Sequence, residues 1–362
     1  MARGRRNNFD ARKAPFPWFG GKSKAAPAVW AALGDVDHYV EPFAGSCAVL
    51  LGRPHEANRA YHSETVNDLD GFVSNFWRAL AANPDAVADA ASWPVSEADL
   101  HARHVAILRW RDSGAADRLA GDAAFHDPVI AGWWAWGLCS WIGGGWGSHC
   151  GPWWPDEEGR LVKRAREPGV SRRLPHVTSS KGVNSASLRE PGLGEPHPRT
   201  MPRLRTWLWL LAARLRHVRV LNGDWRRACT DGSLRTLTVR RQGGVAGVFL
   251  DPPYADTAGR KSDIYACEDL QVAHAVREWA LERSSVPWLR IVMAGFQGEH
   301  GDAFARAGWR EVEWYQAGWL TGGMGNNVSQ QHRERLWLSP QCLAPDAPDR
   351  CTLWAVPNGE SS

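Results

Sequence analysis

Strand-like and helix-like segments alternate at both ends of this chain of 362 residues. Residues 38–43 (HYVEPF) and 60–66 (AYHSETV) have the composition of strands, and residues 44–52 and 69–82 have the apolar spacing of helices. The alternation returns in the last part of the chain, where we expect helices at 202–218 and 269–282 and strands at 218–224, 245–250, 288–295, 311–316 and 333–339. Because parallel strands are joined by crossing helices, this order predicts an α/β fold with one central sheet.

The alternation is interrupted between residues 83 and 205. This segment opens with an alanine-rich part that we expect to be helical and continues through the stretch WIGGGWGSHCGPWWP. It ends in a polar stretch, about residues 156–200, that is rich in proline, glycine and serine and predicts a long functional or mobile loop. We therefore divide the chain into a first core part (1–82), an inserted region (83–205), a second core part (206–343) and a C-terminal tail (344–362).

The composition is typical of a soluble globular protein, with 44% hydrophobic and 23% charged residues. No apolar run is long enough to span a membrane, and the basic N-terminal segment is unlike a secretory leader. The seven cysteines are an odd number and widely scattered, which disfavours a disulfide framework. We expect a cytoplasmic protein without a membrane partner, either a monomer or a weak dimer.

Basic residues and tryptophans are unevenly distributed. The formal net charge is only +4, but there are two basic clusters: Arg3, Arg5, Arg6, Arg12 and Lys13, and Lys163, Arg164, Arg166, Arg172 and Arg173. Such clusters either bind phosphates or are solvated loops, and both interpretations stay open. Many of the 22 tryptophans lie between residues 133 and 154. Core packing is the more common role of a tryptophan, and stacking on bases is the alternative.

Acidic residues end or follow four of the expected strands: Glu41, Asp68, Asp224 and Asp251. In open α/β sheets, ligands bind beyond the carboxyl ends of the strands. After the first strand, the small residues Ala44-Gly45-Ser46 predict a tight turn. Asp68 lies about 20 residues past that turn, where an acid binds ribose hydroxyls in nucleoside-binding units. A helix N-cap formed by Asn67 or Asp68 is the alternative, and both roles are compatible.

The fourth strand ends in the sequence Asp251-Pro252-Pro253-Tyr254. The two prolines lack N–H donors, so this turn offers mainly acceptors, namely the Asp251 carboxylate and backbone carbonyls. Tyr254 adds an aromatic face. A planar ring with an exocyclic amine fits this set, because the ring stacks on Tyr254 while the amine donates to Asp251 and to the Pro252 carbonyl.

Three motifs in this order resemble the Dam-like family of N6-adenine DNA methyltransferases: FPWFGGK (16–22), EPFAGSC (41–47) and DPPY (251–254). The resemblance covers about residues 14–82 and 217–343 and fades over the inserted region. It implies a Rossmann-like methyltransferase sheet, with the inserted region as the DNA-recognition domain. Cys47 replaces the last glycine of the family's turn pattern, for which we expect a modest geometric change.

The resemblance also implies a reaction and its residues. S-adenosylmethionine is the expected methyl donor, and the expected substrate is an adenine flipped out of double-stranded DNA in a bacterial or phage-infected cell. The residues expected to bind the cofactor are Trp18, Lys22, Phe43, Gly45 and Asp68. Asp224 or Trp225 is expected to contact the adenine of the cofactor, and Asp251 is expected to contact both the cofactor and the target base. Asp251, Pro252, Pro253 and Tyr254 are expected to hold the target adenine.

Other assignments stay open. An N4-cytosine methyltransferase needs the same acceptors, although the motif order argues against it. A catalytically impaired DNA-binding protein with this fold, and an enzyme that methylates RNA or protein glutamine, are further alternatives. The spacing of Cys139, His149 and Cys150 fits no standard zinc pattern, so we expect no metal.

Overall fold

The computed structural model describes residues 14–18, 21–54, 62–122, 124–141, 145–148, 153–155, 161–163, 200–236, 239–240, 243–253, 271–299, 301–314 and 334–344. Within these ranges lie the turn after the first strand, the Asp-Pro-Pro turn and the first motif except for residues 19 and 20. Tyr254, the stretch 164–199, the N-terminal basic cluster and the tail beyond residue 344 lie outside the described residues.

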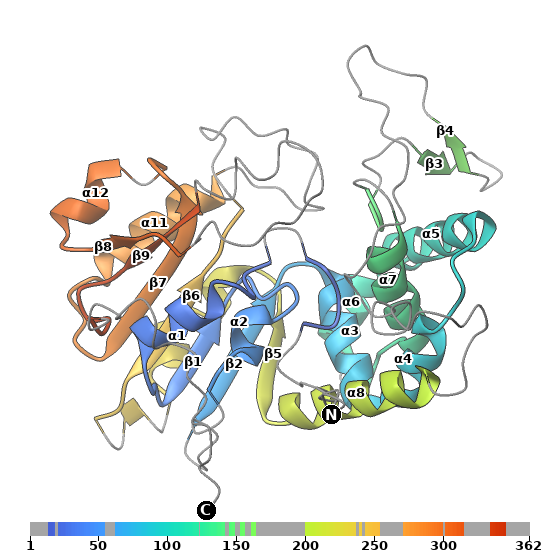
Figure 1. Cartoon of the computed structure of the whole chain (residues 1–362), viewed down its shortest axis with the longest axis horizontal. Coiled ribbons are helices and arrows are strands. Elements are labelled where there is room, and N and C mark those ends of the chain that lie inside the picture. The colour runs from blue at the N-terminus through green and yellow to red at the C-terminus, as the bar shows by residue number, and fades with distance from the viewer. Residues whose placement is uncertain are drawn as a thin grey trace, which may run out of the picture.

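A seven-stranded sheet forms the centre of the described structure (Figure 1). Its strands, in spatial order, are β5 (Val218–Asn222), β2 (Ser63–Asp68), β1 (His38–Glu41), β6 (Ala246–Leu250), β7 (Leu289–Phe296), β9 (Glu334–Leu338) and β8 (Arg310–Val312). The first five are parallel, and β9 is antiparallel to both of its neighbours. The chain builds outward from β1 to β5 on one side and from β6 to β7 on the other. The strand order therefore reverses between β1 and β6, where such sheets bind ligands.

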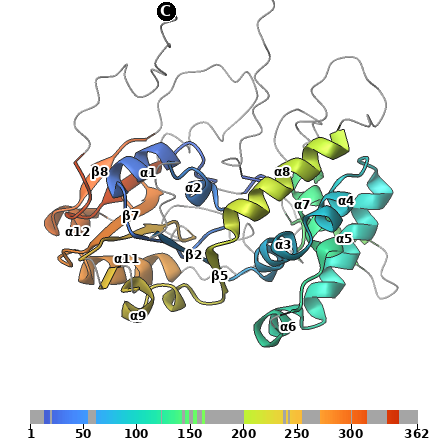
Figure 2. The same ribbon diagram turned by 90° about the horizontal axis from the view of Figure 1, so that it is seen from below.

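Side chains alternate between the two faces of the sheet along each strand. Both faces carry apolar side chains here, and helices cover both of them. Tyr39 and Phe249 belong to a core with helices α1 (Ala26–Leu33) and α2 (Ala48–Leu51). Val40 and Val248 belong to a second core with α9 (Asp231–Leu234), α11 (Val272–Glu282) and α12 (Gly301–Arg306). Figure 2 shows the two helical layers on opposite sides of the strands. The predicted α/β class with a Rossmann-like sheet is confirmed.

A group of helices packs beside the β5 and β2 side of the sheet (Figure 1). It consists of α3 (Gly71–Ala82), α4 (Pro84–Ala91), α5 (Glu97–Asp112), α6 (Ala115–Gly121), α7 (Pro128–Ser140) and α8 (Thr200–Leu215). Helix α7 is apolar on all sides because it is central: it contacts α3, α4 and α5. Trp134 and Trp136 of α7 are fully buried, so core packing is the role that the structure shows for these two tryptophans.

The expected element positions hold with small shifts. The second strand begins at Ser63 and runs to Asp68, and the helix expected at 202–218 begins at Thr200 and ends at Leu215. The alanine-rich part after residue 83 is helical, as predicted. The boundary at 205/206 falls inside α8, which contacts both α3 and α4, and the division into domains stays a prediction. A short hairpin, β3 (Trp153–Pro155) with β4 (Leu161–Lys163), completes the described elements of the inserted region. No helix in the described part of the chain is long and apolar enough to cross a bilayer.

Candidate active site

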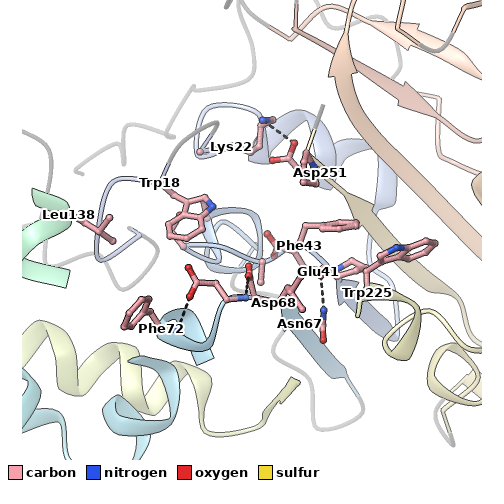
Figure 3. Close-up of a pocket in the computed structure, with 18 of the residues that line it drawn as sticks. Trp18, Lys22, Glu41, Phe43, Asn67, Asp68, Phe72, Leu138, Trp225 and Asp251 are labelled. Atoms are coloured by element: carbon pink, nitrogen blue, oxygen red, sulfur yellow. Dashed lines mark hydrogen bonds and ion pairs between the residues drawn. The ribbon is translucent and has the colours of Figure 1, made fainter. Parts of the chain in front are cut away.

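A cavity of about 620 Å³ lies at the carboxyl ends of β1, β2, β5 and β6 (Figure 3). Most of the residues predicted from the sequence line it: Trp18, Lys22, Phe43, Asp68, Asp224, Trp225, Asp251 and Pro253. Gly45 and Pro252 do not line it, although both adjoin residues that do. The volume is in the range of small-molecule sites in proteins. The structure thus brings predicted site residues from five separate segments of the chain to one cavity.

The turn after β1 is held by a carboxylate from the next strand. The Gly45 N–H donates to Asp68 Oδ2 at 2.8 Å, and Gly45 has a φ of +46°, in the left-handed region that favours glycine. The Trp18 indole lies directly over Gly45: a Cβ added there would be 2.3 Å from Trp18 Nε1. Gly45 therefore shapes the cavity by letting the first motif approach the turn.

Cys47 has a left-handed backbone conformation, which favours glycine. Its φ is 54° and its ψ is 31°, and it is the one non-glycine residue with a positive φ in the described part of the chain. The side chain is fully buried, and burial raises the pKa of its thiol well above the usual value. The turn therefore keeps its left-handed geometry, at the cost of some backbone strain.

Two carboxyls, from Asp68 and Asp70, border the cavity at the end of β2. Asp68 accepts the Asp70 N–H at 2.9 Å through Oδ1, in addition to the Gly45 N–H. The N-cap of α3 is Asp70, which accepts the Phe72 N–H at 2.8 Å, so the alternative of a cap at Asn67 or Asp68 is wrong. Burial raises the pKa of both carboxyls, and with the neighbouring Asp68 charge it brings the pKa of Asp70 to about 7.

Asn67 links neighbouring strands beneath the cavity, a role that the sequence interpretation did not predict. Its Nδ2 donates to the Pro42 carbonyl at 3.0 Å and to the Gly223 carbonyl at 2.9 Å. The side chain thereby joins the ends of β1, β2 and β5 beneath the cavity. Its Oδ1 is buried and has no hydrogen-bond partner in the structure. Sequence offers no signal for this role, because the two carbonyls are far apart along the chain.

Glu41 forms part of the cavity wall and is buried. Its Oε2 accepts the Tyr39 hydroxyl and the Leu50 N–H, each at 3.1 Å. Burial is the main reason that the pKa of Glu41 is raised to about 8, and the nearby carboxylates of Asp251 and Asp68 raise it further. The cavity therefore contains a carboxyl that is protonated at neutral pH.

Replacement of Glu41 by glutamine is expected to stabilise the protein without ligand at pH 8 and not at pH 4. In the unfolded chain this carboxyl ionises near pH 4.5, whereas in the folded chain it ionises near pH 8. Wild-type stability is therefore lost as the pH rises between these values, and glutamine, which cannot ionise, avoids this loss. We expect a gain of about 1 kcal/mol or more at pH 8 in urea unfolding. An equal pH-dependent gain in the exposed Glu282→Gln variant would contradict the explanation.

Asp224 and Trp225 follow β5 and form another side of the cavity. Asp224 caps the short 3₁₀ helix η2 (Trp225–Arg227) by accepting the Arg226 N–H at 2.8 Å. Trp225 is buried, and its ring centroid is 6.1 Å from that of Phe43. Both rings thus offer apolar surface beside an exposed carboxylate, a combination suited to a planar ring with an amino group.

Lys22 lies against the Asp-Pro-Pro turn (Figure 3). Its Nζ is 3.1 Å from Asp251 Oδ1 and 4.0 Å from Glu334 Oε2. The lysine side chain is only 3% exposed. The sequence interpretation assigned Lys22 to the cofactor, whereas the structure shows it in contact with the expected catalytic carboxylate.

The inserted region supplies a wall of the same cavity, which the sequence interpretation did not foresee. Trp134 and Leu138 of α7 line it, together with residues 145–148. Trp134 also contacts the first motif, with ring centroids 4.9 Å from Phe16 and 6.0 Å from Trp18. The predicted ligand pocket is therefore closed in part by residues outside the two core parts.

Replacement of Gly137 by alanine is expected to weaken cofactor binding while the fold is kept. A Cβ at Gly137 would be 1.8 Å from the Trp146 ring, so this indole must leave its place in the cavity wall. The ring belongs to a side chain that can move, so we expect a change in the free energy of unfolding below about 2 kcal/mol. Calorimetric titration with cofactor measures the effect. Gly121→Ala is the matched control, because its added Cβ meets nothing within 4 Å; equal affinities in both variants would contradict a role for this wall.

Possible metal ligands are few in the described structure. No group of three or more histidine, cysteine, aspartate or glutamate side chains gathers there in a way that could hold a metal ion. Cys139 lies near the end of α7, and His149 and Cys150 lie outside the described residues. The expectation that the protein holds no metal stays a prediction.

The fold and the cavity together define a class of protein. A sheet of this order, with a cavity at its switch point that contains a small-residue turn, an acid after β2 and an Asp-Pro-Pro turn, is a Rossmann-like methyltransferase fold. Residues 18–102 match the model of the D12 class N6 adenine-specific DNA methyltransferases. This match confirms the resemblance to the Dam-like family, and that family implies an adenine-specific DNA methyltransferase. No curated protein matches the chain at a significant level.

The matched residues include the first motif from Trp18 onward, the turn after β1 and the acids at the end of β2, and they end within α5. The Asp-Pro-Pro turn lies outside the match. Its position in the same cavity, 3.1 Å from the lysine of the first motif, is therefore a separate observation that agrees with the family.

Proposed function

We propose that the protein transfers a methyl group from S-adenosylmethionine to N6 of an adenine that is flipped out of double-stranded DNA. The observation that carries this proposal is the single cavity that brings the turn after β1 together with Asp251 and Pro253. The family match supports DNA as the substrate and adenine as the base. The DNA contacts are proposed to come in part from the inserted region, 83–205, whose polar stretch is rich in basic residues.

The residues that line the cavity fit the proposed cofactor. Asp68 is placed to accept ribose hydroxyls, while Trp225 and Asp224 suit the adenine ring and its amino group. Phe43 and Trp18 supply apolar surface on either side of the turn, and Gly45 brings the backbone close. The cofactor supplies a methyl group on a positively charged sulfur, which is a good leaving group.

The protein's own contribution is to prepare the attacking nitrogen. The N6 lone pair of adenine is delocalised into the ring and reacts poorly. Asp251 accepts a hydrogen bond from one N6 hydrogen and the Pro252 carbonyl is proposed to accept the other, so the lone pair is localised for attack. As the new N–C bond forms and the S–C bond breaks, N6 releases one of its two protons, by way of Asp251, to solvent. Tyr254 is proposed to stack on the extruded ring, which offsets part of the cost of unstacking, a few kcal/mol. Positioning then supplies much of the rate, without a covalent enzyme intermediate.

Product analysis tests this function. The purified protein is incubated with unmethylated DNA and the deuterated-methyl cofactor, and the DNA is digested to nucleosides for mass spectrometry. We expect labelled N6-methyldeoxyadenosine. Labelled N4-methyldeoxycytidine would instead identify a cytosine enzyme, and cofactor binding without any labelled nucleoside would favour an impaired enzyme.

A further inference from the structure

The feature that calls for explanation is the buried charge of Lys22. A lysine side chain is seldom buried without a partner, because desolvation of the ammonium group is costly. Lys22 is anchored at the start of α1, where its carbonyl accepts the N–H groups of Ala25 and Ala26, each at 2.9 Å. From there its side chain extends to the end of β6, away from the helix that it begins (Figure 3).

The ammonium group of Lys22 lies between two carboxylates. Asp251 Oδ1 is 3.1 Å away at the end of β6, and Glu334 Oε2 is 4.0 Å away at the start of β9. These two strands flank β7 and β9 is antiparallel to it, so Lys22 lies where β6 and β7 end and β9 begins. The nearer contact is a charge-assisted hydrogen bond to the residue that must accept a hydrogen from the target amine.

Asp251 is otherwise in acidic surroundings. Glu41 and Asp68 line the same cavity, and electrostatic interaction with Asp251 contributes to the raised pKa of Glu41. Desolvation disfavours the ionised form of a partly buried carboxyl such as Asp251, and any ionised fraction of the neighbouring carboxyls adds repulsion. The contact with Lys22 counters both effects and also restricts the orientation of the carboxylate.

From this arrangement we infer that Lys22 is a positioning residue for Asp251, holding the carboxylate ionised and oriented toward the target amine, rather than a ligand of the cofactor. The inference rests on the proposed function, in which Asp251 accepts a hydrogen from the exocyclic amine. It replaces the assignment of Lys22 to the cofactor that the first motif suggested, and it gives that motif a part in base chemistry.

The test separates the two roles by measuring cofactor affinity and turnover independently. For Lys22→Gln we expect kcat to fall by about tenfold or more, while the Kd for S-adenosylmethionine in calorimetry stays within about threefold of the wild-type value. Lys22→Arg keeps the charge and is expected to recover at least part of kcat. If Lys22→Gln binds the cofactor ten times more weakly but has an unchanged kcat at saturating cofactor, Lys22 is a cofactor ligand. A wild-type kcat in Lys22→Gln would overturn the inference.

A double-mutant cycle guards against a merely structural effect. If Lys22 acts through Asp251, Lys22→Gln in an Asp251→Asn background should add less than about a threefold loss of kcat. A full additional loss would show that Lys22 acts elsewhere. Should Lys22→Gln fail to fold, Lys22→Met, which keeps the apolar stem and removes the charge, gives the same comparison with and without Asp251→Asn. A wild-type product of N4-methylcytosine would overturn the proposed base and leave this test intact, because a cytosine amine needs the same acceptor.

Discussion

Asparagine in place of Asp251 is expected to lower the rate of methyl transfer by about 10²–10³-fold, the loss typical of removing one electrostatic contact from a transition state. The carboxylate is the acceptor at the end of β6 that lines the cavity, and an amide is a weaker and uncharged acceptor. The effect should fall on kcat, since Asp251 acts on the target amine. Single-turnover kinetics on a DNA fragment that the wild-type protein methylates give the comparison.

The choice of asparagine rather than alanine follows from the contact with Lys22. Alanine removes the nearest partner of a buried ammonium group, and breaking a buried ion pair typically costs about 3–5 kcal/mol. Asparagine keeps an oxygen in place for the lysine, so we expect it to unfold at a temperature closer to that of the wild type. A stable Asp251→Asn variant with near-normal turnover would contradict the proposed role of this carboxylate.

Alanine in place of Gly45 is expected to weaken cofactor binding by tenfold or more, or about 1.4 kcal/mol. Two penalties combine at this position. The added Cβ would lie 2.3 Å from Trp18 Nε1, and the φ of +46° disfavours any side chain by roughly 1–2 kcal/mol. The indole of Trp18 must then withdraw from the turn, and with it one wall of the cavity. Calorimetric titration gives the Kd, and urea unfolding gives the stability.

Gly114→Ala separates these two penalties. Gly114 also has a left-handed backbone, with a φ of +81°, but its added Cβ would meet only Asp117 Oδ2, at 3.9 Å. It precedes α6, outside the cavity lining. We expect Gly114→Ala to lose stability through the backbone alone and to bind the cofactor normally. Equal losses of affinity in the two variants would mean that the contact between Trp18 and Gly45 has no role in binding.

The sheet and one edge of the cavity could be predicted from the sequence because the signals there are local. The strand β6 is a short apolar run followed directly by Asp251, and β2, although more polar, ends in Asp68. Parallel strands then place these ends together without further information. The order of the three motifs indicated the Dam-like family, and the match over residues 18–102 confirms this resemblance.

What the sequence did not predict depends on contacts between distant segments. Trp134 lies against Phe16 and Trp18 only because α7 packs beside α3, and an all-apolar helix gives no sign of which neighbours it meets. The link from Asn67 to Gly223 and the ion pair of Lys22 with Asp251 likewise join residues far apart in the chain. The cap of α3 was misplaced for a simpler reason: several polar residues at the end of β2 are equally good caps, and only the backbone geometry selects Asp70.

The aromatic contacts between α7 and the first motif limit how this protein can be recombined with its relatives. A chimera that exchanges the whole of residues 83–205, the proposed DNA-recognition region, would also exchange Trp134 and Leu138, and with them part of the wall of the proposed cofactor cavity. A graft that begins after residue 148 keeps these wall residues together with the sheet against which they pack. The useful seam for re-engineering specificity therefore lies inside the inserted region, between its helices and its polar stretch, and not at its ends.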